Sequence, residues 1–178
     1  MPRGESFFVT DNKERHYDTN SYPVERTTQR TERRAAQDVG LNVNDQKRKF
    51  LDRVDNFPIE ILYLRDDDIP QSVASGVADL GIVGLNEFEE KAEDVEIVRS
   101  LGFSKCRLSL AVPKGCGYYG LKWFEGKKIA TSYPAILRRF MQENHIAADI
   151  HVITGSVEIS PGIGLADAIF DIVSSGST

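Results

Sequence analysis

The sequence predicts an α/β protein whose strands pair largely in parallel. From Phe57 onward, short apolar runs typical of strands alternate with segments that have helical patterns. The chain has 178 residues, of which 40 % are hydrophobic, so it can form one ordinary domain or two small lobes with a sizeable core. The segment Pro113–Gly117 follows one apolar run and offers a boundary between two such lobes, with a cleft at the hinge.

The predicted strands are short runs rich in aliphatic and β-branched residues. They are Ile59–Leu64, Leu80–Gly84, Val95–Leu101, Cys106–Val112, Lys127–Ser132, Asp149–Thr154 and Ala168–Ser174.

Two helices are predicted between these strands. The first has Asp68 as a favourable N-cap, Pro70 in its first turn and Gly76 at its C-terminal end. The second helix begins at Pro134 and is indicated by apolar residues on one helical face: Ile136, Leu137, Phe140 and Met141. In addition, a helix-like segment, Ser160–Ala168, precedes the last strand.

Residues 1–37 differ from the rest of the chain. They are polar and mixed in charge, and they show neither a two-residue nor a 3.6-residue periodicity. We expect an atypical polar arm, disordered or loosely held, with no strand near residues 15–36 and a short helix over Glu32–Asp38 ended by Gly40. The remaining chain is then divided into a first lobe, residues 38–106, and a second lobe, residues 107–178.

Composition excludes several classes of function. A net charge of −5 and a pI near 5.3 argue against a general binder of nucleic acid or acidic membranes. No apolar run approaches the roughly 18 residues that a membrane helix needs, and the N-terminus lacks the apolar block of a secretory signal. We therefore expect a cytoplasmic protein in which Cys106 and Cys116 are reduced. The histidines lack companions at metal-site spacing.

The last predicted strand runs into a loop of small and hydroxylated residues, Ser174–Thr178. Such a loop can expose several backbone N–H groups with little obstruction, while Ser174, Ser175, Ser177 and Thr178 add hydroxyl donors around Gly176. A phosphate group needs this kind of converging donor set. A lone SGST sequence is nevertheless more often an ordinary polar turn.

Two carboxylates close to this loop favour a phosphate-binding site over an ordinary turn. Asp171 lies within an apolar strand, where an ionised group is costly unless it has partners or faces a cleft. Glu158 could reach the same crevice at the carboxyl end of the strands. Together they suggest binding of ribose hydroxyls and a divalent cation. The alternatives are a helix-start role for Glu158 and a solvated helix face for Asp167.

At this point the sequence resembles a known family. The spacing E-x5-G-x-A-x2-I-x-D-I-x2-S-G-x-T is similar to the signature of the ATP phosphoribosyltransferases. Three other stretches, Asn56–Gly84, Leu101–Pro113 and Gly126–Pro134, also resemble blocks of that family, and the likeness covers about residues 38–178. The signature positions are Glu158, Gly164, Ala166, Ile169, Asp171, Ser175, Gly176 and Thr178.

The resemblance implies a two-lobed fold similar to type II periplasmic binding proteins. It implies a glycosyltransferase that moves the phosphoribosyl group of phosphoribosyl pyrophosphate to N1 of ATP with Mg²⁺, the first step of histidine biosynthesis. By this likeness the loop Ser174–Thr178 holds the 5′-phosphate, and Glu158 and Asp171 contact ribose hydroxyls or Mg²⁺. Arg65 matches an arginine on the nucleotide side, with pairing to Asp66 or Asp67 as the alternative. Feedback by histidine and a homo-oligomeric state are also implied.

The pattern departs from the family in two places. First, the family begins with a strand carrying a Lys/Gly-Arg-Leu segment, and this sequence has no counterpart of it near residues 15–36. Second, the family continues with a helix after the phosphate loop, whereas this sequence ends at Thr178. We therefore expect a fold incomplete at both ends. A non-catalytic or truncated relative remains an alternative. A two-lobed solute-binding protein is disfavoured because no export signal is present, and the phosphoribosyltransferase class with two adjacent acidic residues is disfavoured because Ile172 follows Asp171.

Overall fold

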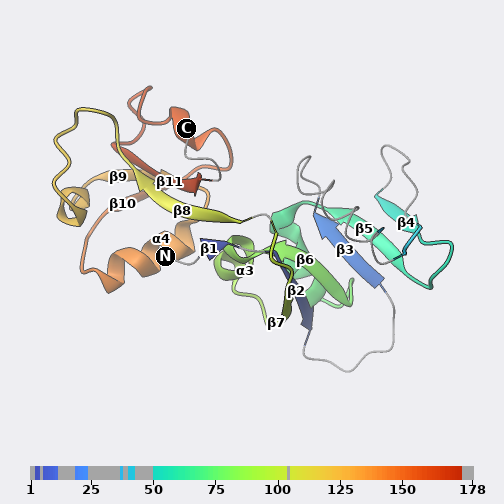
Figure 1. The fold of residues 1–178 in the computed structure, drawn as a ribbon. Coiled ribbons are helices and arrows are strands. Elements are labelled where there is room, and N and C mark those ends of the chain that lie inside the picture. The colour runs from blue at the N-terminus through green and yellow to red at the C-terminus, as the bar shows by residue number, and fades with distance from the viewer. Residues whose placement is uncertain are drawn as a thin grey trace. The chain divides into compact units, whose positions relative to one another are not determined.

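The computed structural model describes residues 3–4, 6–11, 19–23, 37, 40–42, 50–103 and 105–173, and for residues 3–23 it describes the course of the backbone alone. The chain forms two compact units (Figure 1). The N-terminal unit is Gly4–Lys105, and the C-terminal unit is Cys106–Thr178 together with Met1–Arg3. Each unit contains its own sheet and its own hydrophobic clusters.

A mixed sheet of six strands organises the N-terminal unit. Strand β3 (Thr19–Pro23) pairs in parallel with β5 (Glu60–Leu64) and with β6 (Leu80–Gly84). The remaining pairs are antiparallel: β2 (Ser6–Asp11) with β6 and with β7 (Val95–Ser100), and β4 (Leu51–Arg53) with β5. Because β5 and β6 run parallel to the same strand, their carboxyl ends lie at one edge of the sheet. The order across the sheet is β4 (Leu51–Arg53), β5 (Glu60–Leu64), β3 (Thr19–Pro23), β6 (Leu80–Gly84), β2 (Ser6–Asp11) and β7 (Val95–Ser100).

Two short helices pack against one face of this sheet. After the 3₁₀ turn η1 (Asp66–Asp68), helix α2 (Ile69–Ala74) has Pro70 in its first turn, and α3 (Leu85–Lys91) follows β6 directly. Ile69 and Val73 of α2 are buried against Val83 of β6. The helix can approach so closely because the facing position on β6 is Gly81, whose absent Cβ would lie 2.5 Å from Ile69 Cγ2.

The opposite face of the same sheet is covered mainly by loops. Ile61 and Ile82 are buried there with Val54, and Leu41 packs against this cluster. The side chain of Asn56 holds the 40–42 segment in place, since its Nδ2 donates to the Gly40 carbonyl at 2.6 Å and its Oδ1 accepts from the Asn42 N–H at 2.9 Å.

A mixed sheet of five strands organises the C-terminal unit. Strand β9 is parallel to both β10 and β11, whereas β11 is antiparallel to β8. The three parallel strands therefore end at the same edge, called the carboxyl edge below. The order is β1 (Arg3–Gly4), β8 (Cys106–Ala111), β11 (Ala168–Val173), β9 (Lys128–Thr131) and β10 (Asp149–Val152).

The two faces of this sheet have different partners. Helix α4 (Pro134–Glu143) buries Leu137 and Met141 in a cluster with Phe170 of β11, together with Phe124 from the 3₁₀ turn η2 (Leu121–Phe124) (Figure 1). On the other face, Ile169 packs with Ala130, Val157 and Ala166, and Val157 belongs to the 3₁₀ turn η3 (Val157–Ile159). Alternate residues of β11 thus point to opposite clusters, as a strand requires.

The structure confirms the predicted α/β class and places a strand in each of the seven predicted runs. The expectation of largely parallel pairing is wrong, because both sheets are mixed. None of the helices in the described ranges is long and apolar enough to cross a membrane. Cys106 and Cys116 are not joined by a disulfide.

The expectation of no strand near residues 15–36 is also wrong, because β3 lies there, and the arm before it contains β2. Strand β3 lies between β5 and β6, and β2 lies between β6 and β7. This pairing with distant segments is a tertiary effect that local periodicity does not report. Of the helix predicted over Glu32–Asp38, Gln37 is helical and Gly40 adopts a φ of 86°, while most of the segment lies outside the described residues.

Two helical expectations need correction as well. Helix α3 was not predicted, although Leu85 and Phe88 lie one helical turn apart in its sequence. Conversely, the predicted helical segment Ser160–Ala168 forms turns and bends up to the start of β11 at Ala168, with Gly164 at a φ of 74°. Two glycines in five residues lower the helical propensity of that segment enough for tertiary contacts to decide its course.

We predict that Gly81→Ala destabilises the protein. The new methyl group would meet Ile69 Cγ2 at 2.5 Å and Val73 Cγ2 at 3.1 Å, so α2 must shift away from β6. We expect a loss of about 1–3 kcal/mol in the free energy of unfolding, measured by urea denaturation. Gly155→Ala is the control, since no atom lies within 4 Å of the position that its new methyl group would take. Equal effects of the two substitutions would contradict this account of the helix–strand contact.

Candidate active site

The carboxyl edge of the C-terminal unit collects polar residues from three separate stretches of the chain. Ser132 follows β9, Glu158 lies in η3 after β10, and Asp171 lies near the end of β11. Because these strands are parallel, the segments that follow them are brought to one side of the sheet. In open α/β sheets this edge is where ligands bind.

Asp171 extends beyond the parallel part of the sheet. The pairing of β11 with β9 ends at Phe170, opposite Thr131, while the pairing with β8 continues, with Asp171 opposite Ser109. The Ile172 N–H donates to Asp171 Oδ1 at 2.8 Å, so one carboxylate oxygen is held by the strand itself. Asp171 shares the Ile169 face of β11, which is the face that packs against η3.

The pKa of Asp171 is raised above its ordinary value of 3.8. Burial is the largest cause, because it penalises the charged form, and the negative charge of Glu158 adds to it. The hydrogen bond from Ile172 acts in the opposite direction and lowers the pKa. The packing of Val157, next to Glu158, against Ile169 on the same face of β11 as Asp171 accounts for this contribution from Glu158, which is the smallest of the three.

Glu158 is exposed within η3, between the buried residues Val157 and Ser160. The turn begins at Ser156 with a left-handed φ of 54°, which lets the chain reverse after β10. Val157 anchors the turn in the cluster with Ile169 while Glu158 stays accessible. The pair therefore consists of one half-buried and one exposed carboxylate, an arrangement suited to accepting hydrogen bonds or sharing a cation.

The structure adds two hydroxyl residues that sequence reasoning missed. Thr131 is fully buried, and its Oγ1 accepts a hydrogen bond from the Tyr133 N–H at 2.9 Å, which fixes the start of α4. Ser132 Oγ donates to the Ile153 carbonyl at 2.7 Å and so connects the segments after β9 and β10. The sequence signal that could have identified them is a pair of hydroxyl residues between an apolar strand and the proline that begins a helix.

Asp167 is exposed, as expected, but it lies in a bend before β11 rather than on a helix, and it also has a structural role. Its Oδ2 accepts from the Lys128 N–H at 2.9 Å, and its own N–H donates to the Lys128 carbonyl at 2.8 Å. These two bonds join the start of β11 to the start of β9. They fix the register of β11 against β9, and this register determines which residues lie at the carboxyl edge.

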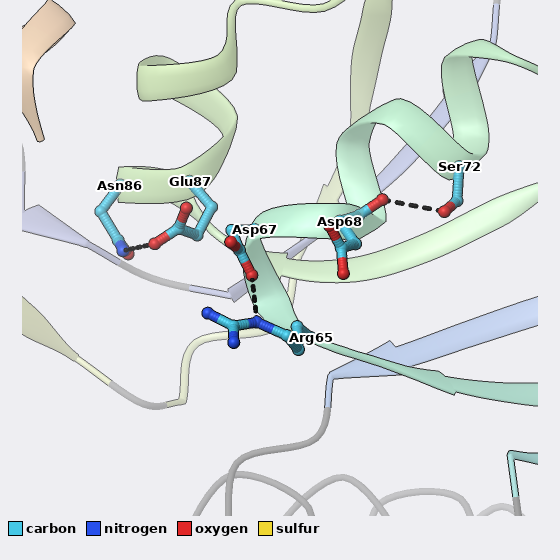
Figure 2. A network of polar contacts seen from close by, with 6 residues as sticks. All are labelled: Arg65, Asp67, Asp68, Ser72, Asn86 and Glu87. Carbon is cyan, nitrogen blue, oxygen red and sulfur yellow. Dashed lines mark hydrogen bonds and ion pairs between the residues drawn. The ribbon is translucent and has the colours of Figure 1, made fainter. Parts of the chain in front are cut away.

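Arg65 lies in the N-terminal unit, directly after β5. Its Nε donates to Asp67 Oδ1 at 3.0 Å, and Figure 2 shows this contact beside Asn86 and Glu87 at the start of α3. The pairing with Asp67 is the alternative that the sequence left open. The hydrogen bond and charge of Asp67 raise the pKa of Arg65, so the guanidinium stays protonated at every working pH.

The loop Ser174–Thr178 lies outside the described residues, so its role as a phosphate loop stays a prediction. Within the described residues, no group of three or more His, Cys, Asp or Glu side chains could hold a metal ion by itself.

The fold and this edge define a ligand-binding α/β protein with a pair of interacting carboxylates beside its parallel strands. Comparison with known proteins makes the class specific, because residues 65–178 match the family described as HisG: ATP phosphoribosyltransferase. The chain belongs to the ATP phosphoribosyltransferase family.

Individual relatives agree with this assignment. The ATP phosphoribosyltransferase of Bacteroides thetaiotaomicron is 71 % identical over 138 residues, covering 78 % of this chain and 49 % of the relative. That of Xylella fastidiosa is 44 % identical over 155 residues, covering 82 % of this chain and 51 % of the relative. The chain thus spans about half the length of the curated relatives it matches.

A solved structure supports the same fold. A chain of the ATP phosphoribosyl transferase (HisG:HisZ) complex from Thermotoga maritima is similar, with a TM-score of 0.73 and 26 % sequence identity. The match covers 89 % of this chain and 75 % of that chain. The likeness therefore extends over both units rather than over one sheet alone.

We predict that Glu158→Gln lowers the pKa of Asp171. Removing a nearby negative charge makes ionisation of Asp171 easier, but the pKa should stay above 3.8 because burial is the larger cause of the shift. The measurement is a titration of carboxyl carbon signals by NMR, with Asp171→Asn identifying the signal. Glu143→Gln, an exposed substitution in α4 on the other face of the sheet, should leave the titration unchanged. An unchanged pKa in Glu158→Gln would mean that the two carboxylates do not interact.

Proposed function

We propose that the protein binds phosphoribosyl pyrophosphate at the carboxyl edge of its C-terminal unit and transfers the phosphoribosyl group to N1 of ATP. The observation that carries this proposal is the location of Glu158 and Asp171 on segments packed against each other, where the parallel strands of a family member end. This reaction is the first step of histidine biosynthesis, and its products are phosphoribosyl-ATP and pyrophosphate.

The two carboxylates suit a ribose. Asp171 Oδ1 is held by the Ile172 N–H, and Oδ2 has no hydrogen-bond partner among the residues that the structure describes. A ribose diol presents two adjacent O–H donors, which could satisfy Oδ2 and the exposed Glu158 together. Such bonds would replace repulsion between two acids with charge-assisted hydrogen bonds. The ribose hydroxyls are therefore the expected ligands of this pair.

The 5′-phosphate would bind to the loop Ser174–Thr178, which follows β11 directly in the sequence. With the ribose on Asp171 and the phosphate on the loop, the sugar is fixed at two points. In the transfer, the bond between C1 and the pyrophosphate oxygen breaks and a bond from C1 to N1 of ATP forms, while pyrophosphate leaves with the electron pair. Positioning of the two substrates can supply most of the acceleration without a covalent intermediate.

Mg²⁺ is the proposed cofactor. Glu158 and Asp171 would hold it with oxygens of the sugar or of the pyrophosphate, which agrees with the preference of Mg²⁺ for one or two carboxylates plus substrate oxygens. When bound, the ion neutralises charge on the departing pyrophosphate.

The nucleotide would bind through Arg65, at the edge where β5 and β6 end. We further propose a cytoplasmic location, feedback control by histidine and assembly into oligomers. The similar Thermotoga maritima chain comes from a HisG:HisZ complex, so assembly with a second kind of subunit is included in this proposal.

The activity can be tested in two forms. In the first, binding of phosphoribosyl pyrophosphate to this chain is measured by calorimetry with Mg²⁺ present. In the second, the matching 138-residue stretch of the Bacteroides thetaiotaomicron relative is replaced by that of this chain, and formation of phosphoribosyl-ATP is assayed. We expect binding in the first form and activity in the second.

The parent Bacteroides thetaiotaomicron protein serves as the positive control in the same assay. If the folded chimera forms no phosphoribosyl-ATP, and neither the chimera nor this chain binds phosphoribosyl pyrophosphate, the proposed function is wrong. Binding without activity in the chimera would instead identify a non-catalytic member of the family.

We predict that Asp171→Ala weakens binding of phosphoribosyl pyrophosphate by about 10- to 100-fold, because a charge-assisted bond to the sugar contributes roughly 1.5–3 kcal/mol. Binding of inorganic phosphate should change much less, since it does not use the ribose contacts. Glu143→Ala on α4 is the matched surface control and should bind normally. Equal affinities of Asp171→Ala and the unchanged protein would refute the assignment of the ribose to Asp171.

A further inference from the structure

A turn fixed at both ends holds the Arg65 side chain in the N-terminal unit. The Asp68 N–H donates to the Arg65 carbonyl at 2.9 Å. Ser72 Oγ donates to the Asp68 carbonyl at 2.8 Å (Figure 2). Asp67 lies inside this turn, so its carboxylate is carried to a set place beside Arg65. The turn follows β5 at the edge where β6 also ends.

The guanidinium is bound through one nitrogen only. Nε donates to Asp67 Oδ1, and within the described part of the chain the guanidinium has no other hydrogen-bond or ion-pair partner. Figure 2 shows the two terminal nitrogens pointing away from Asp67. Their parallel N–H groups form the fork that binds two oxygens of a phosphate.

Three carboxylates surround this cation, but only one of them orients it. Asp66 and Asp68 act on Arg65 through charge alone, whereas Asp67 also accepts a hydrogen bond. Burial tends to raise the pKa of Asp67, and the hydrogen bond and charge of Arg65 outweigh it, so the pKa of Asp67 is lowered. Asp67 is therefore ionised, and its hydrogen bond with Nε sets the orientation of the Arg65 side chain.

We propose that Asp67 is a positioning residue that holds Arg65 with its terminal nitrogens turned outward to bind a phosphate group of the nucleotide. The inference rests on the proposed function, in which ATP binds at this edge. Asp67 itself does not touch the nucleotide, because an acidic side chain would repel the phosphates. Its contribution is to remove the need to order a long, flexible side chain when the ligand arrives.

A second ion pair in the same unit provides a matched control. Arg53 Nε and Glu60 Oε1 are 2.7 Å apart, with side chains 79 % and 40 % exposed. The Arg65–Asp67 pair has nearly the same exposure, 74 % and 39 %. Exposed pairs of this kind add little to stability, so variants of either pair should stay folded. A difference between the two pairs in ligand binding then reports function rather than folding.

The test measures binding of ATP and of adenosine to this chain by calorimetry. Asp67→Ala should raise the Kd for ATP by about 3- to 10-fold, because Arg65 must then be ordered on binding, and leave the Kd for adenosine unchanged. Asp67→Asn keeps the acceptor oxygen and should recover most of the affinity. Glu60→Ala should change neither ligand. In an Arg65→Gln background, Asp67→Ala should have no further effect.

Each possible result bears on a different claim. If the unchanged protein binds no ATP, the proposed function fails and this inference fails with it. If ATP binds but Arg65→Gln binds it equally well, the inference alone is overturned. It is also overturned if Asp67→Ala weakens ATP and adenosine alike, or if it still weakens ATP when Arg65 is already replaced, since either result assigns Asp67 a structural role.

Discussion

The parallel pairing of β9 with β10 and β11 is the constraint on which the rest of the candidate site depends. Residues separated by about forty positions meet because three strands run in the same direction and end together. The Asp167–Lys128 bonds set the start of this register, and Thr131 and Ser132 fix the segments that leave it. A shift of one residue in β11 would turn Asp171 toward the α4 cluster and Phe170 toward η3.

Much of this arrangement could be predicted from the sequence. Runs such as Leu80–Gly84 contain enough aliphatic residues to be strands in any plausible packing, and the structure agrees. Asp171 could be singled out because a carboxylate within an apolar strand must have a compensating environment. Its position on the Ile169 face, and so its approach to Glu158, required only the two-residue alternation of a strand once the neighbouring turn was known.

The remainder could not be predicted because it depends on contacts between distant segments. Strands β2 and β3 gain their hydrogen bonds from partners elsewhere in the chain, and their own sequences show no period. Ser132 and Asp167 have ordinary polar surroundings in the sequence, and their bonding partners lie 21 and 39 residues away. Arg65 could be assigned two acidic neighbours, but only geometry selects Asp67 as the hydrogen-bond acceptor.

The alternation along β11 separates two kinds of evolutionary pressure. Phe170 faces α4 and contributes to the buried cluster, while Ile169 and Asp171 face η3 and the carboxyl edge. Substitutions at the first kind of position alter how long the folded protein survives in a cell. Under the proposed function, those at the second kind alter which ligand the protein recognises. A lineage could therefore change its ligand by exchanging residues on one side of a single strand, without redesigning the core on the other side.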